Sequence, residues 1–308
     1  MKKILITGAT GFIGGWLTKF FIDDGYGIVA HGSSEKTLNT LEKNLSNSHY
    51  SLQNTEFWAQ DFLEKSWDYS FSFSDLDFII HTAAATKVRE GTYENYEKYY
   101  NLNVVAVKQL AKKALEEGIS HFVHLSTGQI FGHPKYFPIT ENTPKNPINL
   151  YGYTKLMGEK VVESLGVFNL LYTIVRPFSV YGKGQDNIIQ IIIDKIKNNE
   201  ALTVYGDGTQ SRAFMHIKDF YNAIKLMLGN PSCFKESFNL SGDKEYSVNY
   251  LIGFISDVLK KKPDFHYEEP KFNELKRNLA DTSKIQKLGF SYECELEEFI
   301  EKKLIHQN

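Results

Sequence analysis

Two side chains in the middle of the chain have the types and the spacing of a proton-transfer pair. Tyr151 and Lys155 lie four residues apart, so on a helix their side chains are neighbours on one face. A phenol has a pKa of about 10 and is a poor base at neutral pH, but a neighbouring ammonium favours the phenolate. The pair therefore predicts Tyr151 as a general acid/base, with Lys155 lowering its pKa.

A glycine-rich segment at the start of the chain has the pattern of a dinucleotide-binding loop. An apolar run at Lys3–Thr7 leads into Gly8, Gly11 and Gly14. Gly8 permits a tight turn, Gly11 lets the backbone approach a pyrophosphate, and Gly14 allows a helix to pack closely on a strand. The phosphates would bind the free N–H groups at the N-terminus of that helix. The residues predicted to hold the cofactor here are Gly8, Thr10, Gly11, Phe12, Ile13 and Gly14.

Apolar runs of strand length alternate with segments of helical period, which predicts an α/β protein with a Rossmann-type, doubly wound parallel sheet. The longest loop is expected between residues 136 and 150, just before Tyr151. The expected strands are Lys3–Thr7, Ile28–His31, Glu56–Ala59, Phe78–His81, His121–Leu125 and Leu171–Arg176, and helices are expected to begin near Gly11, Asn101, Leu150 and Asn187.

The pattern loosens after about Tyr181, which predicts a second, smaller domain. We expect a dinucleotide-binding Rossmann domain at residues 1–180, to which residues 213–240 return. Residues 181–308 would form a mixed α/β substrate-binding domain, placed over the crevice at the carboxyl ends of the strands.

The composition is typical of a globular protein, with 308 residues, 42% hydrophobic and 23% charged. A formal net charge of −2 gives no electrostatic case for nucleic acid or an anionic membrane as a partner. Cys233 and Cys294 are far apart and lack a metal-type spacing, so we expect no metal site. Without a long apolar segment, the chain is expected to be soluble and cytoplasmic.

The glycine spacing, within Thr7–Gly14, resembles the extended branch of the short-chain dehydrogenase/reductases, the NAD-dependent epimerase/dehydratase family that modifies nucleotide sugars. Later segments resemble the same family and extend the likeness over nearly the whole chain. These segments are Leu125–Gly132, Val175–Gly182, Val204–Gly208 and Arg212–Asp219. The resemblance implies an NAD(P)-dependent enzyme with a nucleotide-sugar substrate.

The resemblance also assigns the proton-transfer site. Thr127 falls where the family has a catalytic Ser or Thr, whose hydroxyl would bind the reacting oxygen of the substrate, and Ser126 is the alternative. Lys155 would also hold the nicotinamide ribose. Tyr153 lies on a different helical face from Tyr151 and is expected to have a packing role.

The end of the second strand bears on the choice of cofactor. An Asp or Glu there would accept from the adenosine ribose and favour NAD, but the chain has His31 followed by Gly32, Ser33 and Ser34. His31, Ser33, Ser34 and Lys36 could donate to a 2′-phosphate, so the sequence leans slightly to NADP over NAD. Glu35 could instead reach a ribose, and His31 could simply be a polar residue at the strand end.

Further cofactor contacts come from the resemblance alone. Asp61 and Phe62 would lie near the adenine, Ala83 and Ala84 would let the backbone approach the cofactor or else pack a helix on the sheet, and Asn103 would organise the surroundings. Pro177, Phe178 and Val180 would lie beside the nicotinamide.

Arg212 is the first candidate for the substrate's pyrophosphate, because a planar guanidinium suits two phosphates. The family usually has an Asp at the next position, where this chain has Ala213. Asn187 and Arg277 could make further phosphate contacts, with Lys271 competing with Arg277, and Tyr205 could line the base pocket or simply pack.

The position after Thr127 bears on the reaction. The family's sugar dehydratases and decarboxylases have carboxylates there, and this chain has Gly128 and Gln129. Elimination is therefore disfavoured. We expect a nucleotide-sugar epimerase, with an NADPH-dependent 4-ketoreductase as the alternative and a non-catalytic dinucleotide sensor disfavoured by the intact Tyr151 and Lys155.

The resemblance also bears on the oligomeric state. The family often forms homodimers through a four-helix contact, and a homodimer is expected.

Overall fold

The computed structural model describes residues 1–185, 187–270 and 275–305. The chain forms two compact units. Unit 1 comprises Met1–Gly132, Lys145–Arg176 and Ala223–Phe238, and unit 2 comprises the remaining described residues from His133–Pro144, Pro177–Asn222 and Asn239–Asn308. The domain limits predicted from the sequence, at residue 180 and at 213–240, stay a prediction.

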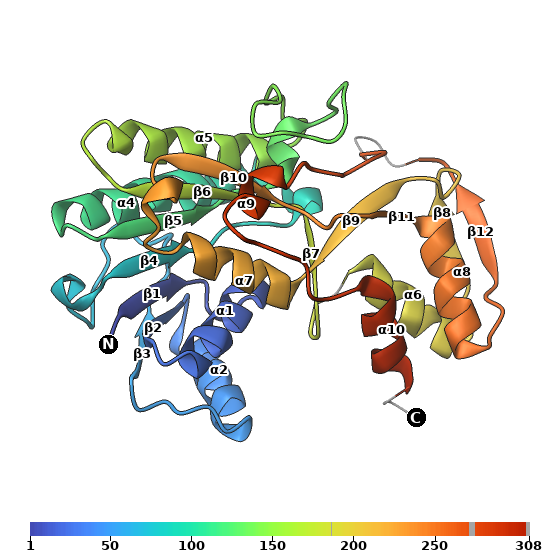
Figure 1. Ribbon diagram of the computed structural model, residues 1–308, viewed down its shortest axis with the longest axis horizontal. Helices are drawn as coiled ribbons and strands as arrows, with labels where there is room; N and C mark the ends of the chain where they lie inside the picture. Colours follow the sequence, from blue (N-terminus) through green and yellow to red (C-terminus); the bar gives the residue numbers. More distant parts are fainter. Residues whose placement is uncertain (186, 271–274, 306–308) are drawn as a thin grey trace. The chain divides into compact units, whose positions relative to one another are not determined.

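A seven-stranded sheet forms the centre of the Rossmann-type fold, in the order β10-β6-β5-β4-β1-β2-β3 (Figure 1). The strands are β1 (Lys3–Thr7), β2 (Gly27–Gly32), β3 (Thr55–Ala59), β4 (Phe78–His81), β5 (His121–Leu125), β6 (Tyr172–Pro177) and β10 (Glu236–Leu240). From β3 to β6 all neighbouring strands are parallel. The chain direction across the sheet reverses between β1 and β4, which is where such folds bind ligands. The predicted fold class is confirmed.

Helices cover both faces of this sheet (Figure 1). One face carries α3 (Tyr96–Tyr100), a π-helical turn (Asn101–Val105), α4 (Ala106–Glu116) and α5 (Leu150–Gly166), and the other carries α1 (Phe12–Asp23), α2 (Glu35–Asn47) and α7 (Ile217–Met227). The core under α4 and α5 joins every second residue of the strands, such as Leu5, Ile79 and Phe122, to Leu110 and Val162. The alternation follows from strand geometry.

Two differences from the predicted elements are local. The helix expected near Asn101 begins at Tyr96 and runs through the π-helical turn into α4, and α2 was not among the predicted helix starts. Short 3₁₀ turns complete unit 1 at Phe73–Asp75, Val88–Glu90, Tyr93–Asn95, Gly128–Phe131 and Pro231–Cys233. The expected loop before Tyr151 is present, and its one isolated bridge among the described residues joins Ile139 to Ala280.

Unit 2 is a mixed α/β structure. Strands β11 (Glu245–Ser247), β9 (Ser211–His216) and β7 (Ser179–Tyr181) form one sheet, and β8 (Leu202–Tyr205) pairs in parallel with β12 (Phe265–Glu268). Its helices are α6 (Ile188–Lys197), α8 (Val248–Leu259), α9 (Ser283–Gln286) and α10 (Leu296–Ile305). Isoleucines on one side of α6, including Ile189 and Ile193, pack with Ile255 and Ile300 in its core.

None of the helices described is long and apolar enough to cross a membrane. Within residues 1–185, 187–270 and 275–305, no three His, Cys, Asp or Glu side chains gather as a metal ion would require.

Candidate functional site

The glycine loop between β1 and α1 has the close backbone contacts that a phosphate cradle needs. Gly8 has φ +69°, a conformation that L side chains rarely adopt. A Cβ on Gly14 would lie 2.3 Å from the Gly8 carbonyl oxygen. Gly11 is the N-cap of α1 and makes no side-chain cap hydrogen bond, so the first N–H groups of α1, at Phe12 and Ile13, have no side-chain cap there. Thr10 is exposed beside them. These residues fit a dinucleotide pyrophosphate.

The residues that follow β4 contact this glycine loop. The Thr82 hydroxyl donates to the Thr7 carbonyl (2.6 Å), and a Cβ on Gly8 would meet the Ala83 backbone at 2.9 Å. Ala83 and Ala84 are half-buried in the segment that follows β4, and Ala83 packs against the core. Ala83 therefore packs against the core and its backbone lies close to Gly8, while an approach of its backbone to the cofactor stays a prediction.

Asn103 links that segment to α5. Its side-chain oxygen accepts from the Ala85 N–H (2.9 Å), and its amide nitrogen donates to the Ala85 carbonyl (3.0 Å) and to the Thr154 hydroxyl (3.0 Å). Asn103 is fully buried in the π-helical turn. It therefore orders the backbone around the predicted cofactor site and does not present its side chain to solvent.

The structure brings Thr127 and Tyr151 together. The Asn149 side chain caps α5 by accepting from the Gly152 N–H (2.8 Å), which places Tyr151 in the first turn and the buried Lys155 one turn later. The Thr127 hydroxyl accepts from the Gln129 N–H (3.2 Å) and hydrogen-bonds the Tyr151 phenol. The Ser126 hydroxyl is buried, with no hydrogen-bond partner in the described part of the chain. The geometry favours Thr127 over Ser126.

Burial dominates the electrostatics of this site. It raises the pKa of Tyr151, and the Thr127 hydrogen bond partly opposes that rise. Burial lowers the pKa of Lys155 to about 8, and Glu159 acts in the opposite direction. The predicted lowering of the phenol pKa by Lys155 is therefore absent in the protein alone, because desolvation disfavours the phenolate more than its neighbours favour it.

A buried ion pair next to Lys155 was missed by the sequence analysis. The Arg176 Nε and Nη2 atoms donate to the two carboxylate oxygens of Glu159 at 2.9 and 3.0 Å, and both side chains are at most 1% exposed. Glu159 lies four residues after Lys155 on α5, and Arg176 is near the end of β6. The signal was in the sequence, since Tyr151, Lys155 and Glu159 repeat at the spacing of one helix face.

His31 differs from its predicted role. Its ring is 3% exposed, Nδ1 accepts from the Gly8 N–H (3.1 Å), and Nε2 bonds the Gln60 carbonyl (2.9 Å). Burial lowers the pKa of His31 to about 4. A neutral, fully engaged imidazole has no free donor for a 2′-phosphate. Ser33 and Ser34 are exposed, but the Ser34 hydroxyl caps α2.

The two residues after β3 that were predicted to lie near the adenine differ in their burial. Asp61 is half-buried and one of its oxygens accepts from the Leu63 N–H (2.9 Å), which leaves a carboxylate near the surface. Phe62 is 5% exposed, with its ring stacked on His31 and on Trp67. The Phe62 side chain is therefore part of the core, and only its backbone could reach a ligand.

Tyr153, which was expected to have a packing role, has a side chain that is 48% exposed. It lies in a shallow surface cavity of about 420 Å³ together with Tyr100, Val104, Leu156, Met157, Lys160 and Val161. The helix face away from Tyr151 is thus apolar and accessible in the single chain.

In unit 2, each predicted substrate residue already has a protein partner. The Arg212 guanidinium donates to the Ser211 carbonyl (2.8 Å), and Ala213 beside it is fully buried in β9. The Asn187 oxygen caps α6 by accepting from the Gln190 N–H (3.1 Å). The exposed Arg277 forms an ion pair with Glu245, its Nε lying 3.1 Å from Oε2.

Four further predicted residues belong to the segments of unit 2. Pro177 and Phe178 are half-buried and Val180 is buried, with the Phe178 N–H bonded to the Leu240 carbonyl (2.9 Å). Lys271 lies outside the described residues.

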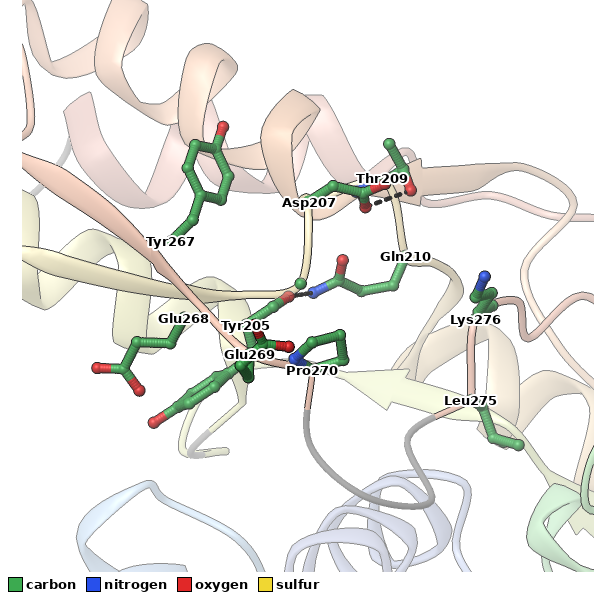
Figure 2. Close-up of a pocket in the computed structure, with 11 residues that line it drawn as sticks. Tyr205, Asp207, Thr209, Gln210, Tyr267, Glu268, Glu269, Pro270, Leu275 and Lys276 are labelled. Atoms are coloured by element: carbon green, nitrogen blue, oxygen red, sulfur yellow. Dashed lines mark hydrogen bonds between the residues drawn. The ribbon is translucent and has the colours of Figure 1, made fainter.

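Tyr205 lines a pocket of unit 2 that has a volume of about 790 Å³. Figure 2 shows the loop after β8 on one side and the residues after β12 on the other. The Gln210 amide donates to the Tyr205 carbonyl (2.8 Å), and the Asp207 carboxylate accepts from the Thr209 hydroxyl (2.6 Å), so the loop is held by its own bonds. The lining residues are Tyr205, Gly206, Asp207, Thr209, Gln210, Tyr267, Glu268, Glu269, Pro270, Leu275 and Lys276.

Comparison with known proteins identifies the family. The UDP-glucose epimerase YtcB of Bacillus subtilis, described as uncharacterized, is 32% identical over 93% of this chain and 91% of its own. A UDP-glucuronic acid 4-epimerase from Bacillus cereus, solved with UDP-glucuronic acid and NAD, is 27% identical, with a TM-score of 0.86 and 99% of both chains covered. A UDP-N-acetylglucosamine 4-epimerase from Methanobrevibacter ruminantium M1, solved with UDP-N-acetylmuramic acid, is 25% identical with a TM-score of 0.87 over 100% of this chain and 99% of that one.

The sequence matches the NAD dependent epimerase/dehydratase family over residues 4–241. That range includes the glycine loop, Thr127, Tyr151, Lys155 and Arg212. The resemblance stated from the motifs is thereby confirmed, and the chain belongs to the NAD dependent epimerase/dehydratase family.

Proposed function

We propose that the protein is an NAD-dependent 4-epimerase of a UDP-sugar. The observation that carries this proposal is the position of Tyr151 in the first turn of α5, where Thr127 acts on its phenol to lower the pKa and the buried Lys155 lies one helical turn away. A phenol so placed can take a proton from a sugar hydroxyl and return it. The family membership and the UDP-sugar relatives support the same assignment.

In an epimerase, Tyr151 alone can both accept the proton that the substrate loses and return it. A nicotinamide held by the glycine loop would supply a hydride acceptor and donor. Tyr151 accepts the proton of the hydroxyl as the sugar carbon becomes a ketone, and donates it back when the carbon is reduced on the opposite face. Thr127 would hold the reacting oxygen. Once the cofactor is bound, the charge of an oxidised nicotinamide would add to that of Lys155, and together they would favour the phenolate.

The residues after Thr127 support epimerisation over elimination. Gly128 is buried and has no side chain, and the Gln129 amide faces the Asn149 side chain at 3.4 Å. An amide is not a proton donor of carboxylic-acid strength. Neither Gly128 nor Gln129 can therefore remove a proton from the sugar or help to expel one of its hydroxyl groups.

NAD is proposed over NADP because His31 offers no charge to a 2′-phosphate. The lean to NADP came from the absence of a carboxylate at the end of β2 and from the donors in its place. With His31 neutral and bonded inside the protein, Ser33 and the exposed Lys36 are the nearby groups left to bind such a phosphate. The B. cereus relative was solved with NAD.

The pocket around Tyr205 is proposed to receive the nucleobase. It offers an aromatic side chain, the Glu268 and Glu269 carboxylates and backbone groups within one unit. Arg212 is proposed to bind the pyrophosphate, since its guanidinium can exchange a backbone carbonyl for a charged partner.

The test is a panel of UDP-glucose, UDP-glucuronic acid and UDP-N-acetylglucosamine, each incubated with the protein and NAD. One of them should reach an equilibrium with its C4 epimer, seen by chromatography and NMR. A sugar labelled with deuterium at C4 should keep its label, because the same hydride returns. Tyr151→Phe should lower kcat by about 10²- to 10⁴-fold. Tyr153→Phe on the same helix is the matched control and should turn over normally.

A 4-ketoreductase remains the alternative, favoured by the lack of a carboxylate after β2. The last residue of that strand is Gly32, which has no side chain, and a Cβ added there would lie only 2.8 Å from the Thr10 methyl group. A ketoreductase would consume one NADPH for each keto-sugar and would not interconvert UDP-sugars. Stoichiometric loss of NADPH absorbance, with no epimer formed from the panel, would replace the epimerase assignment.

We also propose a cytoplasmic homodimer formed through α5 and the π-helical turn that precedes α4. Tyr153 and Met157 are 48% and 40% exposed on a face that continues to Tyr100 and Val104. A second copy of the same face would bury these side chains symmetrically. Light scattering should give twice the chain mass, and Met157→Glu should give the single mass. A monomeric wild-type protein at micromolar concentration would contradict the proposal.

A further inference from the structure

His31 lies directly beneath the glycine loop. Its backbone carbonyl accepts from the Ala9 N–H (2.8 Å), and its ring Nδ1 accepts from the Gly8 N–H (3.1 Å). Two successive N–H groups of the loop thus bond to one residue of β2. Since the Gly8 N–H points at the ring, the orientation of the Thr7–Gly8 peptide is set by His31.

The second ring nitrogen fixes the tautomer. Nε2 lies 2.9 Å from the Gln60 carbonyl, which can only accept, so Nε2 carries the proton and Nδ1 keeps its lone pair for Gly8. The ring is stacked on Phe62, with centroids 4.1 Å apart and an interplanar angle of 11°, and Trp58 lies against it at 4.8 Å. The imidazole can neither rotate freely nor reach solvent.

The neutral state of His31 follows from these surroundings. Burial is the largest influence and lowers its pKa to about 4. Among the described residues, the titratable groups that act on the ring are Asp61, which favours the charged form, and the buried His81, whose own pKa His31 helps to lower. A protonated ring would point an N–H at the Gly8 N–H, and the two donors would force the turn to change.

We propose that His31 is a positioning residue for the cofactor loop: as a neutral imidazole it joins Gly8 to Gln60 and holds the turn in the orientation that receives the dinucleotide pyrophosphate. This inference rests on the proposed NAD cofactor but not on the sugar or the reaction. It replaces the donor role that the sequence suggested for the same residue.

Two substitutions separate the two ring nitrogens. Asn can present an oxygen near the position of Nδ1, and Gln can present an N–H near the position of Nε2. His31→Asn keeps the acceptor for Gly8, whereas His31→Gln keeps the donor to Gln60. Each variant loses one buried hydrogen bond, so their thermal midpoints should fall by similar amounts. A purely structural role would therefore affect NAD binding equally in both.

The measurement is the Kd of NAD by calorimetry, with kcat at saturating NAD as a second readout. We expect His31→Asn to bind within about 3-fold of the wild type and His31→Gln to bind about 10-fold more weakly, as the loss of one hydrogen bond predicts. The kcat of both should stay near that of the wild type. Equal NAD affinities in the two variants would overturn the proposal.

The tautomer can be observed without cofactor or substrate. In ¹⁵N-labelled protein at pH 6, His31 should appear as neutral imidazole protonated at Nε2. An imidazolium, or a proton at Nδ1, would overturn the proposal whatever the enzyme does. If instead the wild type binds no NAD while the predicted tautomer is seen, the proposed function fails and the bond to Gly8 stands.

Discussion

At the scale of the residue, the orientation of the Thr127 hydroxyl sets the environment of the Tyr151 phenol. The Gln129 N–H donates to the Thr127 hydroxyl, which leaves the Thr127 proton for the Tyr151 oxygen. A donor aimed at the phenol opposes the effect of burial on its pKa. Thr127 is thus the side chain through which the loop after β5 adjusts the base.

Replacing Thr127 tests that role. Thr127→Val removes the hydroxyl at nearly constant volume, and we expect kcat to fall by about 10- to 100-fold, the cost of one hydrogen bond to a charged oxygen. Thr127→Ser should recover most of the loss. The acidic limb of the kcat pH profile should move to higher pH in Thr127→Val, because the phenol pKa rises. An unchanged profile would contradict the assignment.

At the scale of the element, α5 carries Tyr151, Lys155 and Glu159 on one face, and Glu159 ties that face to β6 through Arg176. A buried ion pair is weak evidence of stability as a pair, but breaking it leaves a charge without compensation. Arg176 already has one buried nitrogen, Nη1, with no hydrogen-bond partner among the described residues.

Glu159→Gln should lower the free energy of unfolding by about 3 kcal/mol or more, since the Arg176 charge loses its counter-charge. It should also move the alkaline limb of the kcat pH profile to lower pH. Glu159 raises the pKa of Lys155, so without it the ammonium is lost at a pH below about 8. Urea unfolding and the pH profile are the two measurements. The exposed pair of Lys160 and Glu163 is the control, and Glu163→Gln should change neither.

Replacing a glycine by alanine should have opposite effects on stability in helices α1 and α8. A Cβ on Gly14 in α1 would lie 2.3 Å from the Gly8 carbonyl oxygen, while a Cβ on Gly253 in α8 meets nothing within 4 Å. Gly14→Ala should therefore destabilise the protein and abolish NAD binding. Gly253→Ala should stabilise it by about 0.5–1 kcal/mol, through helix propensity alone. Thermal unfolding and NAD titration of the two variants check the prediction.

At the scale of the whole molecule, buried neutral histidines make the fold sensitive to acid. Burial lowers the pKa of His31, His121 and His216 to about 4. Burial also lowers the pKa of His81 and of His124 well below the ordinary histidine value of 6.5. Histidines are charged in the unfolded chain below about pH 6.5 but stay neutral in the folded protein. The unfolded state therefore binds more protons as the pH falls from 6.5 towards 4.

The free energy of unfolding should be steady above pH 6.5, as far as these groups determine it, and should drop steeply as the pH falls to 4. His31 alone would account for roughly 3 kcal/mol of that drop. His124→Phe should make the slope shallower, because it removes one ring whose two nitrogens lack partners in the described part of the protein. Denaturant unfolding from pH 4 to 8 measures the slope, and an equal slope in His124→Phe would contradict this account.

The sequence by itself determined the features that depend on near neighbours. Three strands, Lys3–Thr7, Phe78–His81 and His121–Leu125, were predicted with both ends correct, because strands buried on both faces leave short, mostly apolar runs. The start of α5 and the adjacency of Tyr151 and Lys155 followed from helical spacing. The glycine positions followed from the backbone conformation that they permit.

Only the tertiary structure decided which partner each polar side chain has. Arg277 pairs with Glu245, 32 residues away, and Glu159 pairs with Arg176 on another element. His31 turned inward to Gly8 and Gln60, which are 23 and 29 residues distant, and so became neutral. Burial and hydrogen bonding set charge and direction, and both are sums over groups that the fold brings together from distant parts of the chain.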